Sequence, residues 1–259
     1  MKANTDRAQR FAFDIVAEQY DNGRPRFDLT LVNRALLWCS NGSTPKQVLE
    51  IGAGTGQLTR ALVLAGLKVV ALEPGRLMSR KLRHNLGSAI AIHRSTFEDF
   101  NALRPFDAIF AANSFHWLDP SISYSKSRTL LRPDGHLVLL WNFPIVADAY
   151  LQRRLNATVF VGAWRDMAKD PDGYLAGVRR LLAEGRAELK ATGCFLPPRW
   201  GILKRTRTLD AQLYAQWLSS LSNTAANWND MAKRVRAALL GEDSIRILDY
   251  VYMSAARRL

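Results

Sequence analysis

One stretch constrains the fold of this chain more than any other: an apolar run that leads into three glycines spaced two residues apart. The run is residues 47–51, and Gly52, Gly54 and Gly56 follow it. Such a run is typical of a strand covered on both faces, as in a parallel sheet. Glycine permits a sharp turn and the close approach of a ligand. The helix predicted next presents free N–H groups, so the sequence predicts a strand–turn–helix unit with a ligand at the turn.

The rest of the chain repeats this alternation of strand and helix. Further strands are predicted at 68–72, 89–93, 107–112, 136–141 and 245–255, helices at 5–20, 29–39, 58–65, 76–86, 120–131, 209–221 and 228–240, a turn at 132–135, and β-like structure at 188–208. Phe11 and Ile15 are expected on the apolar face of the first helix, with Phe13 and Val16 as further candidates for that face. Alternating strands and helices predict a parallel sheet with right-handed crossovers and a ligand at the carboxyl ends of its strands.

We therefore predict a Rossmann-like, doubly wound α/β fold with a mostly parallel seven-stranded sheet. The expected segments are an N-terminal helical cap (1–44), a nucleotide-binding core (45–144), a helical insertion or lid over the ligand edge (145–188) and a C-terminal completion of the sheet (189–259). Together they are expected to form one domain, because the length suits a single large α/β unit.

Composition narrows the class of protein. The hydrophobic fraction of 48% is ample for a core, and no run approaches the roughly 20 apolar residues of a membrane span. Cys39 and Cys194 stand far apart and outside metal-binding spacing, which predicts free thiols in the cytoplasm and no metal site. The net charge of +13 leaves nucleic acid open as a partner. The basic residues are spread along the chain, however, which favours a generally arginine-rich surface.

The glycine spacing argues against the common phosphate-binding turns. A dinucleotide site needs G-x-G-x-x-G, and its third glycine would fall at Gln57. A P-loop needs a Gly-Lys-Ser/Thr sequence that is absent here. Glu73 ends the second predicted strand, about 20 residues after the turn, where a carboxylate can accept both ribose hydroxyls of a nucleoside. A nucleoside without a pyrophosphate therefore fits the pattern better than a dinucleotide.

These features together resemble the class I S-adenosylmethionine-dependent methyltransferases, and most closely their small-molecule, type-11-like branch. The resemblance covers residues 11–143 well and the later segments loosely. It rests on residues 48–57 with Glu73, and on residues 95–100, 106–109, 114–120 and 131–135. It implies S-adenosylmethionine as the cofactor and S-adenosylhomocysteine as the product.

The resemblance also implies a role for each matching residue. Glu73 would hold the ribose hydroxyls, Glu50 would meet the amino group, and Phe97 would offer its backbone N–H to the adenine. Tyr20 and Arg24 would close over the methionine carboxylate from the N-terminal cap. The full set expected at the cofactor is Tyr20, Arg24, Glu50, Gly52, Ala53, Gly54, Gly56, Glu73, Pro74, Thr96, Phe97, Glu98, Asn113 and Ser114. Many relatives have Asp where Thr96 stands.

The reaction this implies is in-line transfer of a methyl group to O, N or C of a small, fairly apolar molecule. The protein must mainly align the nucleophile and exclude water. His116 is a candidate general base, or it shapes the acceptor site together with Trp117 and Trp164. An RNA methyltransferase, favoured by the charge, and a cofactor-binding protein that no longer transfers methyl groups remain alternatives. The pattern leaves open whether the protein is a monomer or a homodimer.

Overall fold

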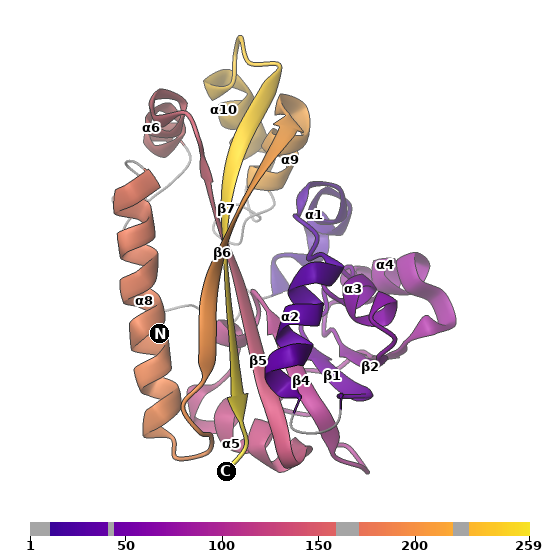
Figure 1. Cartoon of the computed structure of the whole chain (residues 1–259). Coiled ribbons are helices and arrows are strands. Elements are labelled where there is room, and N and C mark those ends of the chain that lie inside the picture. Colours follow the sequence, from indigo (N-terminus) through magenta and orange to yellow (C-terminus); the bar gives the residue numbers. More distant parts are fainter. Residues whose placement is uncertain (1–10, 41–43, 159–170, 220–227) are drawn as a thin grey trace.

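A seven-stranded sheet lies at the centre of the computed structural model, which describes residues 11–40, 44–158, 171–219 and 228–259 (Figure 1). The strands are β1 Gln47–Ile51, β2 Lys68–Leu72, β3 Ala91–His93, β4 Phe106–Ala112, β5 Leu131–Val146, β6 Arg199–Asp210 and β7 Ser244–Arg257. Their order is β3-β2-β1-β4-β5-β7-β6, with β1 to β5 parallel and β7 antiparallel to both of its neighbours. The predicted Rossmann-like, mostly parallel sheet is confirmed.

Helices cover both faces of this sheet. They are α1 Ala17–Gly23, α2 Leu29–Cys39, α3 Thr59–Leu64, α4 Arg76–Leu86, α5 Pro120–Leu130, α6 Ala149–Thr158, α8 Pro171–Ala191, α9 Ala211–Ser219 and α10 Trp228–Ala238, with short 3₁₀ turns η2 Asp14–Val16, η3 Gly87–Ala89 and η4 Phe115–Trp117. Local sequence explains where two of them begin: Asp28 and Asp119 cap α2 and α5, and Pro120 suits the first turn of α5. No helix in the described parts of the chain is long and apolar enough to cross a membrane.

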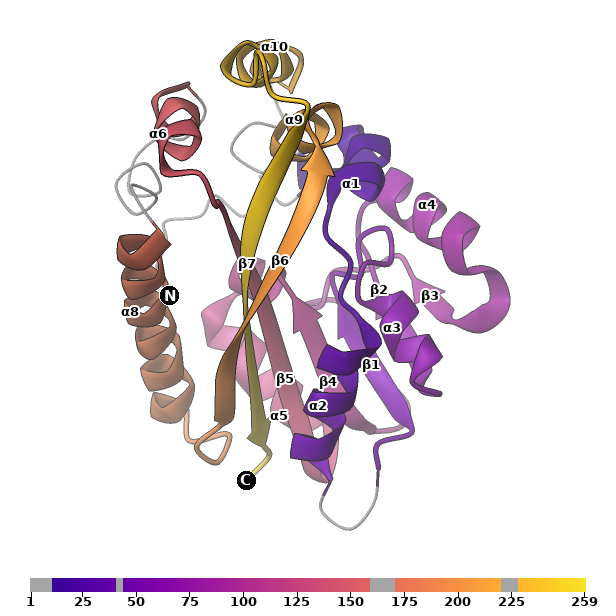
Figure 2. The ribbon, with the colours of Figure 1, turned by 45° about the horizontal axis from the view of Figure 1, so that its top comes forward.

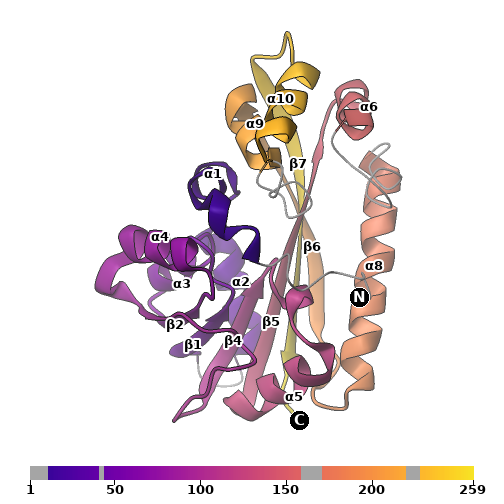
Figure 3. The same ribbon diagram turned by 180° about the vertical axis from the view of Figure 1, so that it is seen from behind.

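The two faces of the sheet carry separate apolar clusters. One cluster joins α2 and α3 to the sheet and is centred on buried Val48, Phe110 and Val138. The other joins η4, α5 and the end of α8 to the opposite face, through residues such as Phe115 and Leu189. Figure 3 shows α5 in front of the sheet and α8 beside it, whereas α2 lies in front in Figure 1. Burial on both faces explains the almost uninterrupted apolar runs of β1 and β4.

Strands β5 and β7 continue well past the carboxyl ends of β1 and β4. Ala112, the last residue of β4, pairs with Leu140, but β5 runs on to Val146 and stays paired with β7 as far as Ile247. Helices α6, α9 and α10 pack around this extension (Figure 2). The carboxyl edge of the parallel strands is therefore bounded on one side by a wall of sheet.

Three local predictions were wrong. The turn expected at 132–135 lies inside β5, where Asp134 takes φ 62° and the register with β4 shifts, so this segment distorts the ladder without ending it. At the N-terminus Ile15 is 62% exposed and Val16 is buried, because η2 turns every three residues and moves the predicted helical face. The β-like segment at 188–208 begins as the last turn of α8, and β6 starts only at Arg199. The division of the chain into four segments stays a prediction.

Candidate active site

The glycine turn after β1 forms the floor of the candidate site. Gly52, Gly54 and Gly56 have φ values of 67°, 58° and 105°, which side chains rarely adopt. A Cβ at Gly52 would lie only 2.6 Å from Cβ of Ser114, whose hydroxyl donates to the Ile51 carbonyl at 2.6 Å. The turn is thus held directly against the loop that follows β4. Gly56 instead faces α4, where a Cβ would meet leucine side chains at 3.0 and 3.1 Å.

Glu73, at the end of β2, is held in one orientation by two backbone groups. Its Oε2 accepts from Gly54 N at 2.8 Å and its Oε1 accepts from Gly75 N at 2.9 Å. Burial raises the pKa of this carboxyl to about 7, although the two hydrogen bonds lower it, and Asp14 raises it further. Each oxygen keeps another lone pair, so the carboxylate can accept two more hydrogen bonds from a ligand. Pro74, the next residue, is half-buried beside it.

Glu50 is a second buried carboxyl group near the first. It lies at the carboxyl end of β1, is 1% exposed, and its Oε2 has no hydrogen-bond partner among the described residues. Burial raises its pKa to about 8; the nearby Thr59 hydroxyl opposes the rise and the charge of Glu73 adds to it. A buried carboxylate of this kind is costly unless a cation or a donor satisfies it. A positively charged ligand group next to Glu50 would therefore stabilise the ionised carboxylate.

We expect Glu50→Gln to stabilise the ligand-free protein at high pH. The folded protein holds the Glu50 proton up to about pH 8, whereas the unfolded chain loses it near pH 4.5. The stability that this group contributes is therefore complete below about pH 4.5 and falls as the pH rises to about 8. Glutamine has no such proton, so its advantage in Tm should be small at pH 5 and about 5–10 °C at pH 9, by differential scanning fluorimetry.

The matched control for this variant is Glu184→Gln, on the exposed side of α8. Its Tm should follow that of the wild-type protein at both pH values. A Glu50→Gln variant whose Tm difference from wild type is the same at pH 5 and pH 9 would contradict the assigned burial cost.

The segment before α2 covers this floor. The Tyr20 ring lies over Gly54, where a Cβ would sit 3.5 Å from Tyr20 Cε1. The Arg24 guanidinium carbon lies 4.6 Å from the centroid of that ring and 5.7 Å from the centroid of the Phe13 ring. The Phe13 ring in turn meets the Trp117 ring edge-on. Burial lowers the pKa of Arg24, and Tyr20 opposes this. The cover thus brings a cation and three aromatic rings over the carboxyl edge.

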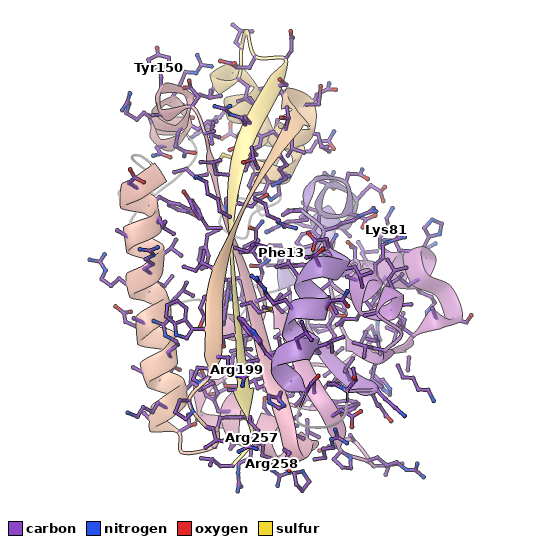
Figure 4. The ribbon with its side chains drawn as sticks, in the orientation of Figure 1. Phe13, Lys81, Tyr150, Arg199, Arg257 and Arg258 are labelled. Carbon is purple, nitrogen blue, oxygen red and sulfur yellow. The ribbon has the colours of Figure 1, made fainter. Side chains whose placement is uncertain are left out.

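Polar contacts attach this cover to α4. Asp14 Oδ1 accepts from the backbone N–H groups of Leu77 and Met78, at 2.6 and 2.9 Å, in the first turn of α4. Lys81 of α4 donates to both carboxylate oxygens of Glu18 at 2.9 and 2.8 Å (Figure 4). Two segments more than 60 residues apart in sequence are therefore joined across the site.

The loop after β4 contains the residues nearest to the β5 wall. Asn113 has φ 53°, and its Oδ1 accepts from Asn142 N at 2.9 Å. His116 Nδ1 accepts from the indole N–H of Trp141 at 3.3 Å. Burial lowers the pKa of His116 to about 4, and the charge of Arg24 lowers it as well. His116 is therefore neutral near pH 7 and, with Nδ1 accepting, carries its proton on Nε2.

The residues expected at the adenine lie beyond β3. The Thr96 hydroxyl donates to Asp99 Oδ2 at 2.6 Å and accepts from Asp99 N at 3.2 Å, so it is already engaged in its own turn. The Phe97 ring is 2% exposed and packs in the core, and the Glu98 carbonyl accepts from Lys126. This segment can therefore offer a ligand mainly its backbone.

A polar network behind the site escaped the sequence analysis. Asn142 Nδ2 donates to Asp249 Oδ1 at 2.9 Å, and Arg207 Nε donates to Asp249 Oδ2 at 2.6 Å. Asp249 is fully buried. Since Asn142 N also holds Asn113, the network links β6 and β7 to the loop after β4. A single acidic residue in the middle of an apolar strand indicates a buried polar partner, and this signal in the sequence could have revealed the network around Asp249.

The structure brings most of the predicted cofactor residues to one edge, but not all predicted site residues. Gly52, Gly54, Glu50, Glu73, Tyr20, Arg24, Asn113 and Ser114 meet there. Trp117 is buried between Phe13 and His116. Trp164 lies outside the described residues. Within the described ranges no group of three His, Cys, Asp or Glu side chains is arranged to hold a metal ion.

Comparison with known proteins agrees with this geometry. The chain is 34% identical over 139 residues to an uncharacterized methyltransferase of Mycobacterium tuberculosis. The aligned segment covers 52% of this chain and 54% of that protein. The chain is also 33% identical over 106 residues to an uncharacterized methyltransferase of Bacillus cereus, and that alignment covers 40% of this chain and 50% of that protein. The chain thus spans about half the length of the curated relatives it matches.

Solved structures share the fold at low identity. A candidate type II methyltransferase from Anaeromyxobacter dehalogenans has a TM-score of 0.60 and 19% identity, over 90% of this chain and 97% of that one. A plantazolicin methyltransferase has a TM-score of 0.50 and 11% identity, over 98% and 97%. Residues 49–137 match the family described as a methyltransferase domain. Over residues 49–137 this chain is therefore similar to methyltransferase domains, and its fold is shared with solved methyltransferases.

Proposed function

We propose that this chain binds S-adenosylmethionine at the carboxyl edge of β1, β2 and β4 and transfers its methyl group to a small molecule. The observation that carries the proposal is the pair of buried carboxyl groups, Glu50 and Glu73, beside the glycine turn. Glu73 is oriented by two N–H groups, and Glu50 Oε2 has no partner among the described residues. A nucleoside with two ribose hydroxyls and an amino-acid ammonium group would satisfy both carboxylates.

The other residues at this edge would hold the rest of the cofactor. Tyr20 and Arg24 would contact the methionine carboxylate, because the guanidinium lies with the Tyr20 ring above Gly54. The remaining contacts would come from Gly52, Ala53, Gly56, Pro74, Thr96, Phe97, Glu98, Asn113 and Ser114. Bound S-adenosylmethionine supplies an activated methyl group, whose carbon–sulfur bond breaks as an acceptor lone pair bonds to the carbon and the electron pair returns to sulfur.

The protein's own task is then alignment and exclusion of water. Phe13, Tyr20 and Arg24 cover the edge, and the β5 wall closes its far side. The lone pair on His116 Nδ1 is engaged by Trp141, which supports a role in shaping the acceptor site over a role as general base.

A small acceptor fits the charge distribution better than RNA does. Three arginines lie at the end of the sheet away from the carboxyl edge: Arg199, Arg257 and Arg258 (Figure 4). At this end Arg257 of β7 is the strand-register partner of His136 of β5. The plantazolicin methyltransferase of similar fold was solved with a triazolic analogue of desmethyl plantazolicin and S-adenosylhomocysteine. We expect this chain to act in the cytoplasm as a monomer or homodimer.

Mass spectrometry of small molecules retained by the purified protein tests the proposal first. S-adenosylmethionine or S-adenosylhomocysteine should be retained, and calorimetric titration with S-adenosylhomocysteine should give a micromolar Kd. Incubation with S-adenosylmethionine and a panel of small phenols, amines and carboxylates should then yield methylated product.

Three results would count against the proposal. No heat of binding with either cofactor form up to about 1 mM would refute the binding site. Tight cofactor binding without demethylated cofactor across the panel would favour a binding protein that has lost methyl transfer. Methyl incorporation into RNA, with RNA retained at roughly 50 mM salt, would favour the nucleic-acid alternative.

A further inference from the structure

A pocket of about 630 Å³, partly open to solvent, lies on the α5 and α8 face of the sheet. Its walls are largely apolar and aromatic, with Phe115, Leu182 and Leu189 from the helical side and Trp141 and Tyr252 from the sheet. Ligand pockets typically have apolar walls with few polar groups. The pocket is separate from the glycine turn, and none of the residues that line it is among those expected at the cofactor.

Trp141 and Tyr252 line the sheet side of this pocket, and the Trp200 ring continues their row beyond the lining. Trp141 of β5 lies 6.0 Å from Tyr252 of β7, and Tyr252 lies 6.3 Å from Trp200 of β6, between ring centroids. The three rings are tilted by 31–40° between neighbours. A flat, apolar ligand can pack against such a row with a large contact area.

Arg186 places one positive charge at the end of this row. Its guanidinium carbon lies 3.9 Å from the centroid of the Trp200 ring. Burial raises the pKa of the Tyr252 hydroxyl, and the nearby Arg186 guanidinium opposes that rise. Arg186 Nη1 is buried and has no hydrogen-bond partner among the described residues. A buried donor without an acceptor costs free energy that an anionic ligand oxygen would recover.

The pocket reaches the proposed methyl-transfer edge through His116 and Trp141. Both line the pocket, and they are hydrogen-bonded to each other. His116 also lies close enough to Arg24 for the charge of that residue to lower its pKa. It follows Asn113 and Ser114 by only a few residues, in the loop after β4. A molecule in the pocket therefore has one end at the carboxyl edge and the other at Arg186.

We propose that this pocket binds the methyl acceptor and that the acceptor is a flat, apolar carboxylic acid whose carboxylate pairs with Arg186. The inference rests on the proposed function, which places the methyl donor at the neighbouring edge. A carboxylate matches the planar guanidinium fork, and the stacked Trp200 ring holds that fork in place. Glu188, the other charged residue in the lining, already has an interaction partner in the structure.

Paired acids and amides test the proposal in the presence of saturating S-adenosylhomocysteine. The probes are 4-hydroxybenzoate with 4-hydroxybenzamide, cinnamate with cinnamamide, and indole-3-acetate with indole-3-acetamide, titrated by calorimetry and by quenching of tryptophan fluorescence. At least one acid should bind about tenfold or more tightly than its amide. Arg186→Gln should lower the binding affinity for that acid by about 10–50-fold and leave the affinity for its amide unchanged within twofold. Only the acid forms a charge-assisted pair with Arg186.

The matched control is Arg180→Gln, which removes an exposed arginine from the same helix. Its acid affinity should stay within twofold of wild type, whereas Arg186→Lys should fall between wild type and Arg186→Gln. Unchanged S-adenosylhomocysteine affinity in each variant shows that the fold is intact.

Each opposite result would overturn the inference. Equal affinity for acid and amide, no binding of either member of any pair, or full acid affinity in Arg186→Gln would each do so while leaving the proposed function standing. A wild-type protein that does not bind S-adenosylhomocysteine would overturn the proposed function and this inference with it.

Discussion

Replacing Glu73 with glutamine is expected to weaken S-adenosylhomocysteine binding by about 30–150-fold. The two charge-assisted hydrogen bonds to the ribose hydroxyls, each worth roughly 1.5–3 kcal/mol, would become neutral ones worth roughly 0.5–1.5 kcal/mol, a total loss of about 2–3 kcal/mol. Glutamine also turns one acceptor into a donor, which would then face the N–H of Gly54 or of Gly75. Calorimetric titration at pH 8 measures the loss directly.

The pH dependence of binding gives an independent readout of the same residue. The Glu73 pKa of about 7 means that the ligand-free protein is largely protonated there at pH 6 and largely ionised at pH 8. Since the ionised form is the better acceptor, ionisation of Glu73 alone should raise wild-type affinity about tenfold from pH 6 to pH 8, in addition to the rise that ionisation of Glu50 gives. The rise in Glu73→Gln should be smaller than that of the wild type by this factor of about ten. Glu184→Gln is the charge-matched control, and it should behave as wild type. Wild-type affinity in Glu73→Gln would show that the ribose contact is assigned to the wrong residue.

Replacing Asp249 with alanine is expected to destabilise the protein by about 3–5 kcal/mol. Asp249 is fully buried and pairs with Arg207, whose side chain is 22% exposed, while it also accepts from Asn142. Alanine would leave the guanidinium and the Asn142 amide without their acceptor. A chain of this length should then lose about 6–15 °C in Tm by differential scanning calorimetry.

Two further variants separate the buried pair from a general charge effect. Arg205 lies on β6, as Arg207 does, and forms an ion pair with Asp28. That pair is partly exposed, so its loss in Arg205→Ala should cost about 1 kcal/mol or less. Replacing Asp249 and Arg207 together with leucine and methionine should recover much of the loss, because neither charge is then left alone. If Asp249→Ala unfolded at the same temperature as Arg205→Ala, the network would have no structural importance.

The same network bears on the candidate site. Asn142 N donates to Asn113 Oδ1, and Asn113 has a left-handed backbone conformation beside the proposed methyl donor. Asp249 therefore acts on the site as a positioning residue, through Asn142, with no contact of its own to the loop after β4.

Much of the fold could be predicted because it depends on local pattern. The apolar runs of β1, β2 and β4 and the helical spacing between them are properties of a few consecutive residues. The glycine turn required positive φ at Gly52 and Gly54, and only glycine adopts this freely. The distance from the turn to Glu73 follows from one strand–helix–strand unit, so this carboxylate lies beside the glycine turn at the carboxyl edge.

The missed parts depend on contacts between distant residues. The bond between Asn142 and Asp249 joins residues 107 positions apart, and the cover over the turn depends on Asp14 and Lys81 reaching across to their partners. The length of β5 also escaped the prediction, because β7 supplies the hydrogen bonds that keep it extended to Val146. Strand pairing of this kind has no signature in the sequence of one strand alone.

The sequence by itself determined the order of strands and helices, the glycine turn and the placement of Glu50 and Glu73 at the ends of their strands. These follow from backbone preference and hydrophobic periodicity, which act over a few residues. Only the tertiary structure decided that both carboxyl groups are buried together, that His116 is neutral beside Trp141, and that Arg186 ends a row of rings drawn from three strands. Burial and proton affinity depend on what surrounds a group in space, and residues far apart in the chain supply those surroundings.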